Sequence, residues 1–549
     1  MNLKNLTPHG RGVRGLDLSR SSVFFGGAFG RIFRALPAAE FGPTEVQTRA
    51  NLRALAGKMV STRDDPKDGA DPEESGIPAL YTYLGQFVDH DLTFDPASSL
   101  QQQNDPDGLV DFRTPKFDLD NVYGRGPDDQ PYLYEFSAGS DKAKFVFGKQ
   151  LTGAPAIKPP ARDLARNDAH LPDAQRARAI IGDPRNDENA LVSQLQGLFL
   201  RFHNRLVDDK KMSFAEAQHT LRFHYQWMLI NDFLVKLVNP KTLHTVFPHL
   251  ASHKSIADDP PQLEFYPTPK QEAFMPLEFS VAAYRFGHSM VRPGYRLNDG
   301  DATLLPIFAL KTETQAQRIS LRGFMAPADA WAIDWGRFID IDDRPNGVML
   351  DDNGKINGKD PTPEQRAQMK NRLQLAYRVD TSLVFPLGGL PEDVADPFIR
   401  SLAERNLLRG WRLRLPSGQA VARAMGVKPL DKIVIGKFQD DGDPDSADIT
   451  NLKDKNGKPI TNPVNIFEDN CPLWAYCLAE TSHHTVPGKF GVNSKLLGEV
   501  GGQIVAETFA GLLVNDSQSF LSQDPRWKPT IGDGKNFGLR DFVNFAIGK

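Results

Sequence analysis

The sequence contains only two cysteines, Cys471 and Cys477, among its 549 residues. So few cysteines exclude a disulfide framework, an iron–sulfur cluster and a cysteine-rich zinc site. If the segment between them is helical, their six-residue spacing places the two side chains on different faces of the helix. We therefore expect two buried free thiols.

Long hydrophobic runs and an excess of basic charge are also missing. No stretch of about 18 apolar residues occurs, so we expect no membrane-spanning helix. The formal net charge is -4, which provides no basic field for nucleic acid. The first twenty residues lack the apolar core and the cleavage site of a secretory signal. We therefore expect a cytoplasmic protein or one exported by a non-classical route.

The sequence does contain long helical patterns. Apolar residues recur at helical spacing in 189–208 and 214–238, and 500–514 is typical of a buried helix. Strand-like alternation is short, and 430–438 is the best example. These patterns predict a mainly α fold with little β structure.

The connecting segments are rich in Asp, Gly, Pro and Asn, and none of them is a clear interdomain linker. We therefore predict an N-terminal arm over 1–60 that packs on one large domain over 61–549. The acidic loops at 351–360 and 440–448 lack the central glycine and terminal glutamate of an EF-hand, and we expect solvated turns there.

One histidine lies between two carboxylates in the aromatic segment YTYLGQFVDHDLTFDP. If this segment is helical, Gln86 and His90 share one face, whereas Asp89 and Asp91 point to either side. Taken alone, the segment is better explained as a surface helix with a solvated Asp-His-Asp triplet, because a lone histidine is usually structural.

Three further segments contain candidate residues. Arg185 and Glu188 lie in IGDPRNDEN, before the long helix, where the helix dipole favours the acid but not the arginine. In FSVAAYRFGHSMVRP, His288 lies in an apolar stretch with Arg285 three residues earlier, which suits a haem ligand. Asn406, in LAERNLLRGWRLRLPSGQ, is a candidate hydrogen-bond partner for the second nitrogen of such a histidine.

Together and in this order, the segments resemble the animal haem peroxidases of the peroxidase-cyclooxygenase superfamily. GQFVDHDLTF, TPKFDLDNVYG, GDPRNDE, LFLRFHNRL and AAYRFGHSMVRP carry the resemblance, which covers most of 80–420. Simpler bacterial relatives are the more similar ones, because the disulfides of the mammalian enzymes cannot form here. The resemblance implies a large single haem peroxidase domain that reduces hydrogen peroxide. It also implies oxidation of halide, thiocyanate or phenolic donors through a compound I mechanism.

The resemblance implies roles for the residues on the peroxide side of the haem. His90 matches the distal base, Arg185 the distal cation, and Gln86 the glutamine that orients water and halide. Asp89 and Glu188 match the carboxylates that become ester-linked to haem methyl groups.

The resemblance likewise implies roles on the opposite side. His288 matches the axial ligand of the iron of haem b, Asn406 its hydrogen-bond partner, and Arg285 the partner of a haem propionate. In some members a methionine after the matching glutamate forms a third link to haem. Here that residue is Asn189, which argues against efficient chloride oxidation.

A calcium site is also predicted. Thr114, Lys116, Asp118 and Asp120 alternate along TPKFDLD, so in an extended loop they face one way. Their oxygens, with only the backbone carbonyl of Lys116, would join the carboxylate of Asp91 in the oxygen cage that Ca²⁺ prefers. Family members bind calcium at the matching positions. Without the resemblance, an acidic turn in solvent would be the favoured interpretation.

Two other functions remain in view. Fatty-acid dioxygenases of the superfamily use a tyrosine three residues before the proximal histidine, where this sequence has Arg285. Tyr284 is adjacent but about 100° away on an α-helix, which argues against that activity. A non-catalytic haem-binding or adhesive protein would need added interaction segments such as repeats, RGD or cysteine-rich modules, and the sequence contains none.

Overall fold

The computed structural model describes most of the chain. The described residues are 29–61, 66, 68–70, 72–93, 113–167, 177–267, 273–300, 304–309, 319–345, 348, 355–391, 399–436, 447–487, 493–534 and 536–549. Residues 1–28 of the expected arm, and 351–354 and 440–446 of the two acidic loops, lie outside these ranges. The remainder of the first loop has an exposed turn at 357–360, as predicted.

The fold is mainly α, as the sequence predicted. The longer helices are α1 (Glu45–Lys58), α2 (Leu80–Leu92), α4 (Ala190–Asp208), α5 (Phe214–Met228), α9 (Pro363–Lys370), α10 (Leu402–Arg412), α12 (Leu473–Glu480), α13 (Glu499–Val514) and α15 (Leu539–Ile547). The shorter ones are α3 (Asp120–Tyr123), α6 (Leu234–Leu237), α7 (Pro240–Val246), α8 (His249–Ser252), α11 (Gly418–Ala424) and α14 (Phe520–Gln523).

The β structure of the described residues consists of two-stranded pairs. One pair is parallel, β1 (Phe29–Gly30) with β7 (Met275–Pro276). The antiparallel pairs are β2 (Glu74–Pro78) with β10 (Leu375–Tyr377), β3 (Tyr134–Glu135) with β4 (Lys144–Phe145), β5 (Phe147–Gln150) with β6 (Arg162–Leu164), β8 (Gly294–Tyr295) with β9 (Leu305–Pro306), β11 (Val434–Ile435) with β12 (Ala447–Asp448), and β13 (Thr485–Pro487) with β14 (Asn493–Lys495). The strand expected at 430–438 is thus only the short β11.

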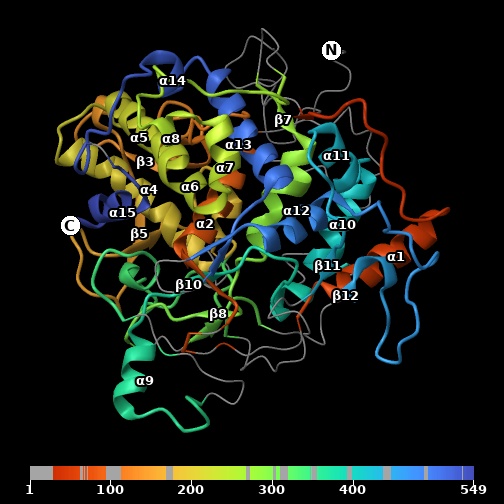
Figure 1. Cartoon of the computed structure of the whole chain (residues 1–549). Coiled ribbons are helices and arrows are strands. Elements are labelled where there is room, and N and C mark those ends of the chain that lie inside the picture. The colour runs from red at the N-terminus through yellow and green to blue at the C-terminus, as the bar shows by residue number, and fades with distance from the viewer. Residues whose placement is uncertain are drawn as a thin grey trace.

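Helix α2 lies at the centre of the molecule and contacts α4 (Figure 1). Its apolar side packs on α4, where the rings of Phe87 and Phe199 stack 4.1 Å apart. The start of α4 is fixed by Asn189, whose side chain accepts hydrogen bonds from the backbone of Leu191 and Val192. Because α4 is buried along nearly its whole length, it holds α2 on a rigid support.

The segment before His288 is not a regular α-helix. Residues Glu278–Ala282 form a π-helical turn, η9, and Ala283–His288 form a 3₁₀-helix, η10. A 3₁₀-helix turns by about 120° per residue, so side-chain directions here differ from those on an α-helix. The angle of about 100° between the side chains of Tyr284 and Arg285 holds for an α-helix and is therefore wrong here. On the 3₁₀-helix the angle is about 120°, so the two side chains still point in different directions.

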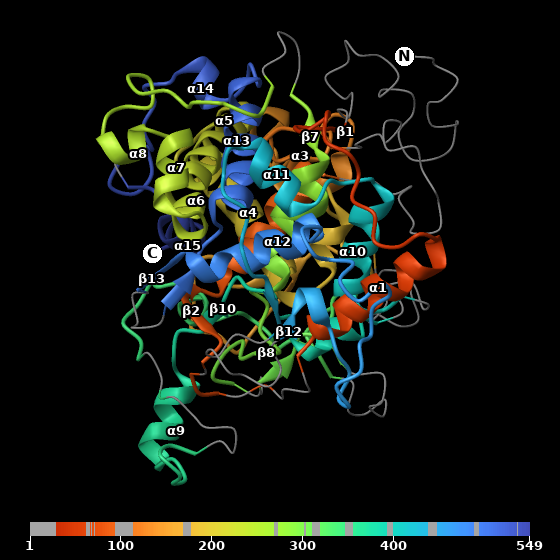
Figure 2. The same cartoon turned by 45° about the vertical axis from the view of Figure 1, so that its right-hand side comes forward.

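The described part of the arm packs on the rest of the chain. Helix α1 lies beside α10, as both views show (Figure 1, Figure 2). The backbone amides of Ile32 and Phe33 donate to the buried carboxylate of Glu278 at 3.1 and 3.0 Å. The arm is therefore anchored directly to the turn that leads into His288.

Cys471 and Cys477 are both free and buried, which confirms the expectation from the sequence. Over the described ranges, no helix combines the length and apolarity needed to cross a bilayer.

Candidate active site

A cavity of about 230 Å³ lies between the C-terminal end of α2 and helix α10. Asp89 and Arg185 line it on one side, and Arg285 and Asn406 on the other. The fold thus brings residues more than 300 positions apart in the sequence to one cavity. Neither candidate histidine is among the lining residues, but each adjoins a residue that is: His90 follows Asp89, and His288 is hydrogen bonded to Asn406.

His90 is buried on α2 and its ring is held in one orientation. Its Nδ1 lies 2.6 Å from Oδ1 of Asn186, whose own Nδ2 donates to Gln196 at 2.9 Å. Since the amide oxygen can only accept, His90 donates from Nδ1, and Nε2 is the basic nitrogen. Burial, with the nearby charge of Arg185, lowers the pKa of His90 to about 4, so the ring is neutral at pH 7.

Arg185 lies on the 3₁₀-turn η7 (Pro184–Asp187), not on α4. Its guanidinium pairs with Asp183 at 2.7 Å and donates to the backbone carbonyl of His90 at 3.0 Å. Burial acts to raise the pKa of Asp183, but the charges of Arg185 and Arg113 outweigh it and hold that pKa below its usual range. Asp183 is therefore ionised and fixes Arg185 against the helix that carries His90.

Gln86 and Glu188 contact each other. Gln86 donates from Nε2 to the Glu188 carboxylate and accepts a hydrogen bond from Asn189 at 3.2 Å. Burial raises the pKa of Glu188 to about 7, against the opposing charge of Arg185. Because α2 is an α-helix, Gln86 lies on the same face as His90, as predicted. Its amide contacts the carboxyl group of Glu188, which is half protonated near pH 7.

His288 and Asn406 are joined across 118 residues of sequence. Nδ2 of Asn406 lies 2.9 Å from Nδ1 of His288, and Oδ1 of the amide accepts from Arg285 at 3.3 Å. Half a turn of the amide would let Oδ1 accept from an Nδ1–H group instead, which would leave Nε2 unprotonated. Burial and the charge of Arg285 lower the pKa of His288 to about 3, so the ring is neutral.

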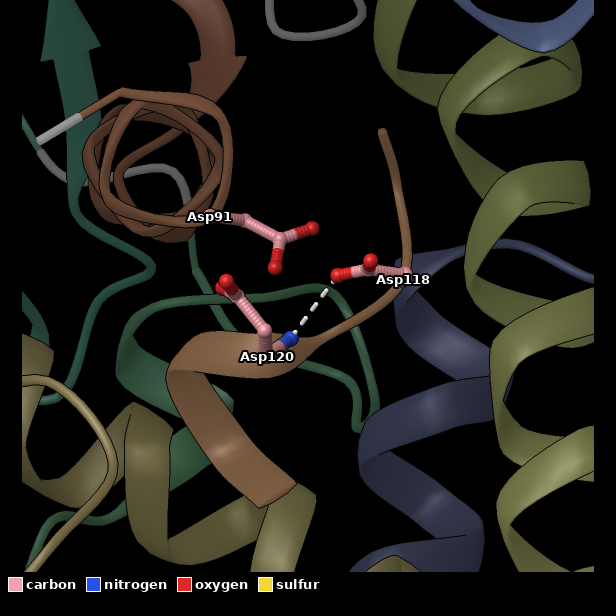
Figure 3. A group of neighbouring side chains, drawn as sticks. All are labelled: Asp91, Asp118 and Asp120. Atoms are coloured by element: carbon pink, nitrogen blue, oxygen red, sulfur yellow. Dashed lines mark hydrogen bonds between the residues drawn. The ribbon is translucent and has the colours of Figure 1, made fainter. Parts of the chain in front are cut away.

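The predicted calcium residues also meet. Carboxylate oxygens of Asp91, Asp118 and Asp120 lie within 4.8 Å of one another, with Asp91 pointing from α2 towards the loop (Figure 3). Thr114 donates to Asp118 at 2.6 Å, whereas the ammonium group of Lys116 lies 3.4 Å from the buried carboxylate of Asp516.

The electrostatics of this acidic group fit a cation. Both oxygens of Asp91 are buried without a hydrogen-bond partner. Burial, followed by the charges of Asp118 and Asp120, raises the pKa of Asp91 well above its usual range. Burial likewise raises the pKa of Asp120 to about 7, although Arg113 opposes it. The site would be stabilised by a bound cation or, in its absence, by protons.

The model of the animal haem peroxidase family matches residues 98–326. Chorion peroxidase of Aedes aegypti is 26% identical over 197 residues, which covers 34% of this chain and 22% of that protein. Thyroid peroxidase of Rattus norvegicus is 26% identical over 208 residues, which covers 36% and 20%. Peroxidase A of Dictyostelium discoideum shares the fold with a TM-score of 0.55 at 15% identity, covering 96% of this chain and 94% of that one. Residues 98–326 therefore resemble the animal haem peroxidase family, and the chain shares its fold with a peroxidase of the peroxidase-cyclooxygenase superfamily.

Fatty-acid α-dioxygenase of Oryza sativa also shares the fold. Its TM-score is 0.50 at 16% identity, and the match covers 92% of this chain and 81% of that one. The match to the two curated peroxidases spans about a fifth of their length. The likeness to the animal haem peroxidase family implies haem binding.

The residues around the cavity fit a haem group. His288 is neutral and engaged at Nδ1, so Nε2 is the nitrogen that would bind iron. Arg285, Arg405 and Arg409 line the same end of the cavity. Burial, followed by the charge of Arg409, lowers the pKa of Arg285 to about 10. Two carboxylates, such as the haem propionates, would relieve this repulsion.

Three residues that orient the candidate side chains were not predicted from the sequence. Asn186 orients His90, Asp183 fixes Arg185, and Arg113 pairs with Asp183 at 2.7 Å and with Asp120 at 3.1 Å. Asp183 and Asn186 lie inside the GDPRNDE motif, so the motif itself was the available signal. Arg113 has no such signal, because only the fold reveals that it links the acidic group, through Asp183, to Arg185.

Proposed function

We propose that the chain is a haem peroxidase that reduces hydrogen peroxide and oxidises halide, thiocyanate or phenolic donors. The main support is that neighbours of two neutral, oriented histidines line one cavity: Asp89 precedes His90, and Asn406 is hydrogen bonded to His288. His90 and His288 have different partners, which suits a base on one side and an iron ligand on the other.

His90 is the proposed proton carrier. Asn186 keeps the proton on Nδ1, so Nε2 can take the proton from one peroxide oxygen and deliver it to the other, which leaves as water. Because its pKa of about 4 keeps the ring neutral, His90 accepts a proton over the whole neutral range. Haem, when bound, supplies the iron that exchanges electrons with peroxide and with the donor.

Arg185 is the proposed cation for the negative charge that develops as the oxygen–oxygen bond breaks. Its two bonds, to Asp183 and to the carbonyl of His90, keep it in place before the reaction begins. We assign Gln86 to the orientation of water or halide beside His90. Asn189 in place of a methionine argues for bromide, iodide, thiocyanate or phenols over chloride.

The proximal side of the proposed haem site consists of His288, Asn406 and Arg285. An amide partner transfers less charge to the imidazole than a carboxylate would, which favours a higher iron potential. Asp89 lines the cavity, and its charge and that of the lining residue Arg185 act on Glu188, so we propose Asp89 and Glu188 as candidates for ester links to haem methyl groups.

We further propose that Asp91, Thr114, Asp118 and Asp120, with the carbonyl of Lys116, bind Ca²⁺. The unpartnered oxygens of Asp91 support this assignment. A bound ion would fix the C-terminal end of α2, where His90 lies, because Asp91 follows His90 directly.

The test is an absorption spectrum of the haem-loaded chain, recorded before and after one equivalent of hydrogen peroxide. We expect a Soret band that shifts promptly with peroxide, loss of the prompt shift in His90→Ala, and a changed ferric spectrum in His288→Ala. His219→Ala is the control, because His219 is exposed and outside the cavity. A Soret band that is absent, or that is the same in all four proteins, would refute the proposal.

A fatty-acid dioxygenase is the second candidate. Tyr284 is buried, its hydroxyl has no hydrogen-bond partner, and Asp89 of the cavity contributes to its raised pKa after burial itself. An unpaired phenol near the cavity is the group that such an enzyme would need. Oxygen uptake with palmitate that is lost in Tyr284→Phe would favour this function, whereas halide or guaiacol turnover without oxygen uptake would exclude it.

A further inference from the structure

A second and larger cavity, of about 600 Å³, lies on the outer side of α5, between α8 and α14. These three helices gather on one side of the molecule, away from α10 (Figure 1). The two cavities share no lining residue. Nothing in the proposed peroxidase chemistry uses the second one.

Two polar side chains in this second cavity have no partner within the described protein. His249 is 7% exposed and neither of its ring nitrogens has a hydrogen bond. Nε1 of Trp227 is likewise buried and unpaired. Buried polar groups are normally paired with protein, water or a ligand, so both groups indicate an occupant. Burial lowers the pKa of His249 to about 4, so its neutral ring offers one donor and one acceptor.

The walls of the cavity are aromatic. The rings of Trp227 and Trp527 lie 6.0 Å apart at an angle of 68°, and Phe520 lies 6.0 Å from Trp227. A flat ring placed against these side chains would make edge and face contacts with them. The shape and the polar atoms together favour a small aromatic molecule with a hydrogen-bonding group.

The charge around the cavity is positive. Lys254 and Lys528 line it, are exposed, and have no ion-pair partner in the parts of the chain that the structure covers. Arg526 is paired with Asp258 at 2.6 Å. Asp232, the acidic lining residue, is already engaged, because it accepts from the hydroxyl of Tyr81 at 2.7 Å and from the backbone of Leu539. The lysine charges therefore favour an anion.

We propose that this second cavity binds a small aromatic carboxylate with a hydroxyl group, of the hydroxybenzoate class. The ring lies against Trp227 and Trp527, the hydroxyl meets His249 and Trp227, and the carboxylate faces Lys254 and Lys528. The site is separate from the haem cavity and does not depend on the proposed peroxidase activity.

The test is calorimetric titration of the haem-loaded full chain with 4-hydroxybenzoate and with the neutral 4-hydroxybenzamide. We expect 4-hydroxybenzoate to bind without a change in the Soret band and about tenfold more tightly than the amide. Lys254→Gln/Lys528→Gln should remove that preference and leave amide binding within about twofold of the original protein. Lys432→Gln/Lys455→Gln, at exposed lysines that line neither cavity, is the matched control and should bind like the original protein.

His249→Leu provides a second test, which is expected to fold because His249 makes no hydrogen bond to the described protein. Both probes should bind about tenfold more weakly to it. The proposal is overturned if the original protein binds neither probe, or if both variant proteins bind 4-hydroxybenzoate as the original does. A loss in His249→Leu with no effect of the lysine changes would overturn the assignment of an anion.

Discussion

Replacement of Asp91 by asparagine should stabilise the chain in the absence of calcium and remove most of the stabilisation that calcium provides. Asp91, Asp118 and Asp120 hold carboxylate oxygens within 4.8 Å of one another. At an effective dielectric constant of about 20, two unit charges at that separation repel by about 3.5 kcal/mol. Asp91→Asn removes the negative charge of Asp91 and keeps the size and shape of its side chain. The variant therefore isolates the electrostatic effect.

The pH dependence has a definite sign. The pKa values of Asp91 and Asp120 are raised in the folded chain, so the unfolded chain gives up these protons more easily. The contribution of these two protonated carboxyl groups to the free energy of unfolding is then complete below about pH 4. It is lost as the pH rises towards 7, where Asp120 titrates. Bound Ca²⁺ should reverse this loss, because it replaces the protons as the counter-charge.

The assay is scanning calorimetry at pH 5 and pH 8, in EGTA and in Ca²⁺. Calcium at about a hundredfold over its Kd stabilises by about 2.7 kcal/mol. With an unfolding entropy of about 2.1 cal/mol/K per residue, this raises the Tm of the original chain by about 2 °C at pH 8.

Asp91→Asn should have the higher Tm in EGTA at pH 8, by a similar amount, and should gain little from Ca²⁺. At pH 5 the two proteins should differ less in EGTA. A lower Tm for Asp91→Asn in EGTA, or an equal calcium shift in both proteins, would refute the reasoning.

Three other predictions follow from single contacts. Asn406→Asp should lower the reduction potential of the haem-loaded chain by on the order of 60 mV, measured by spectroelectrochemistry, because a carboxylate makes His288 a stronger donor. Arg113→Gln should slow the stopped-flow reaction with peroxide about tenfold and tighten calcium binding, since Arg113 joins Asp183 to Asp120; unchanged values of both would contradict this link. The pKa of His224 is lowered to about 4 by burial, and its Nε2 accepts two backbone N–H groups at 3.0 and 3.1 Å. Between pH 6.5 and 4 the chain should therefore lose up to about 3 kcal/mol of urea-unfolding free energy through this residue, and His224→Gln should flatten that part of the profile.

The fold class was predictable because helical periodicity survives over long segments. The segments 189–208 and 500–514 became α4 and α13 within a residue of the expected limits. The turn before His288 was not predictable in the same way. Its π and 3₁₀ geometry is set by contacts such as the Glu278 carboxylate with the arm, which lies about 245 residues away in the sequence.

The candidate site was only partly predictable, since motifs identify residue types but not their partners. The sequence placed Arg185 beside Glu188, whereas in the structure Arg185 is bound by Asp183 and Glu188 by Gln86. Each of these pairs costs desolvation that the sequence does not reveal. What these pairs provide is orientation. Asp183 pairs with both Arg185 and Arg113, and Arg113 also pairs with Asp120. The position of Arg185 therefore depends on the acidic loop at Asp120. A change in the calcium site should therefore act on the peroxide side of the proposed haem site through ion pairs, and not only through the backbone of α2.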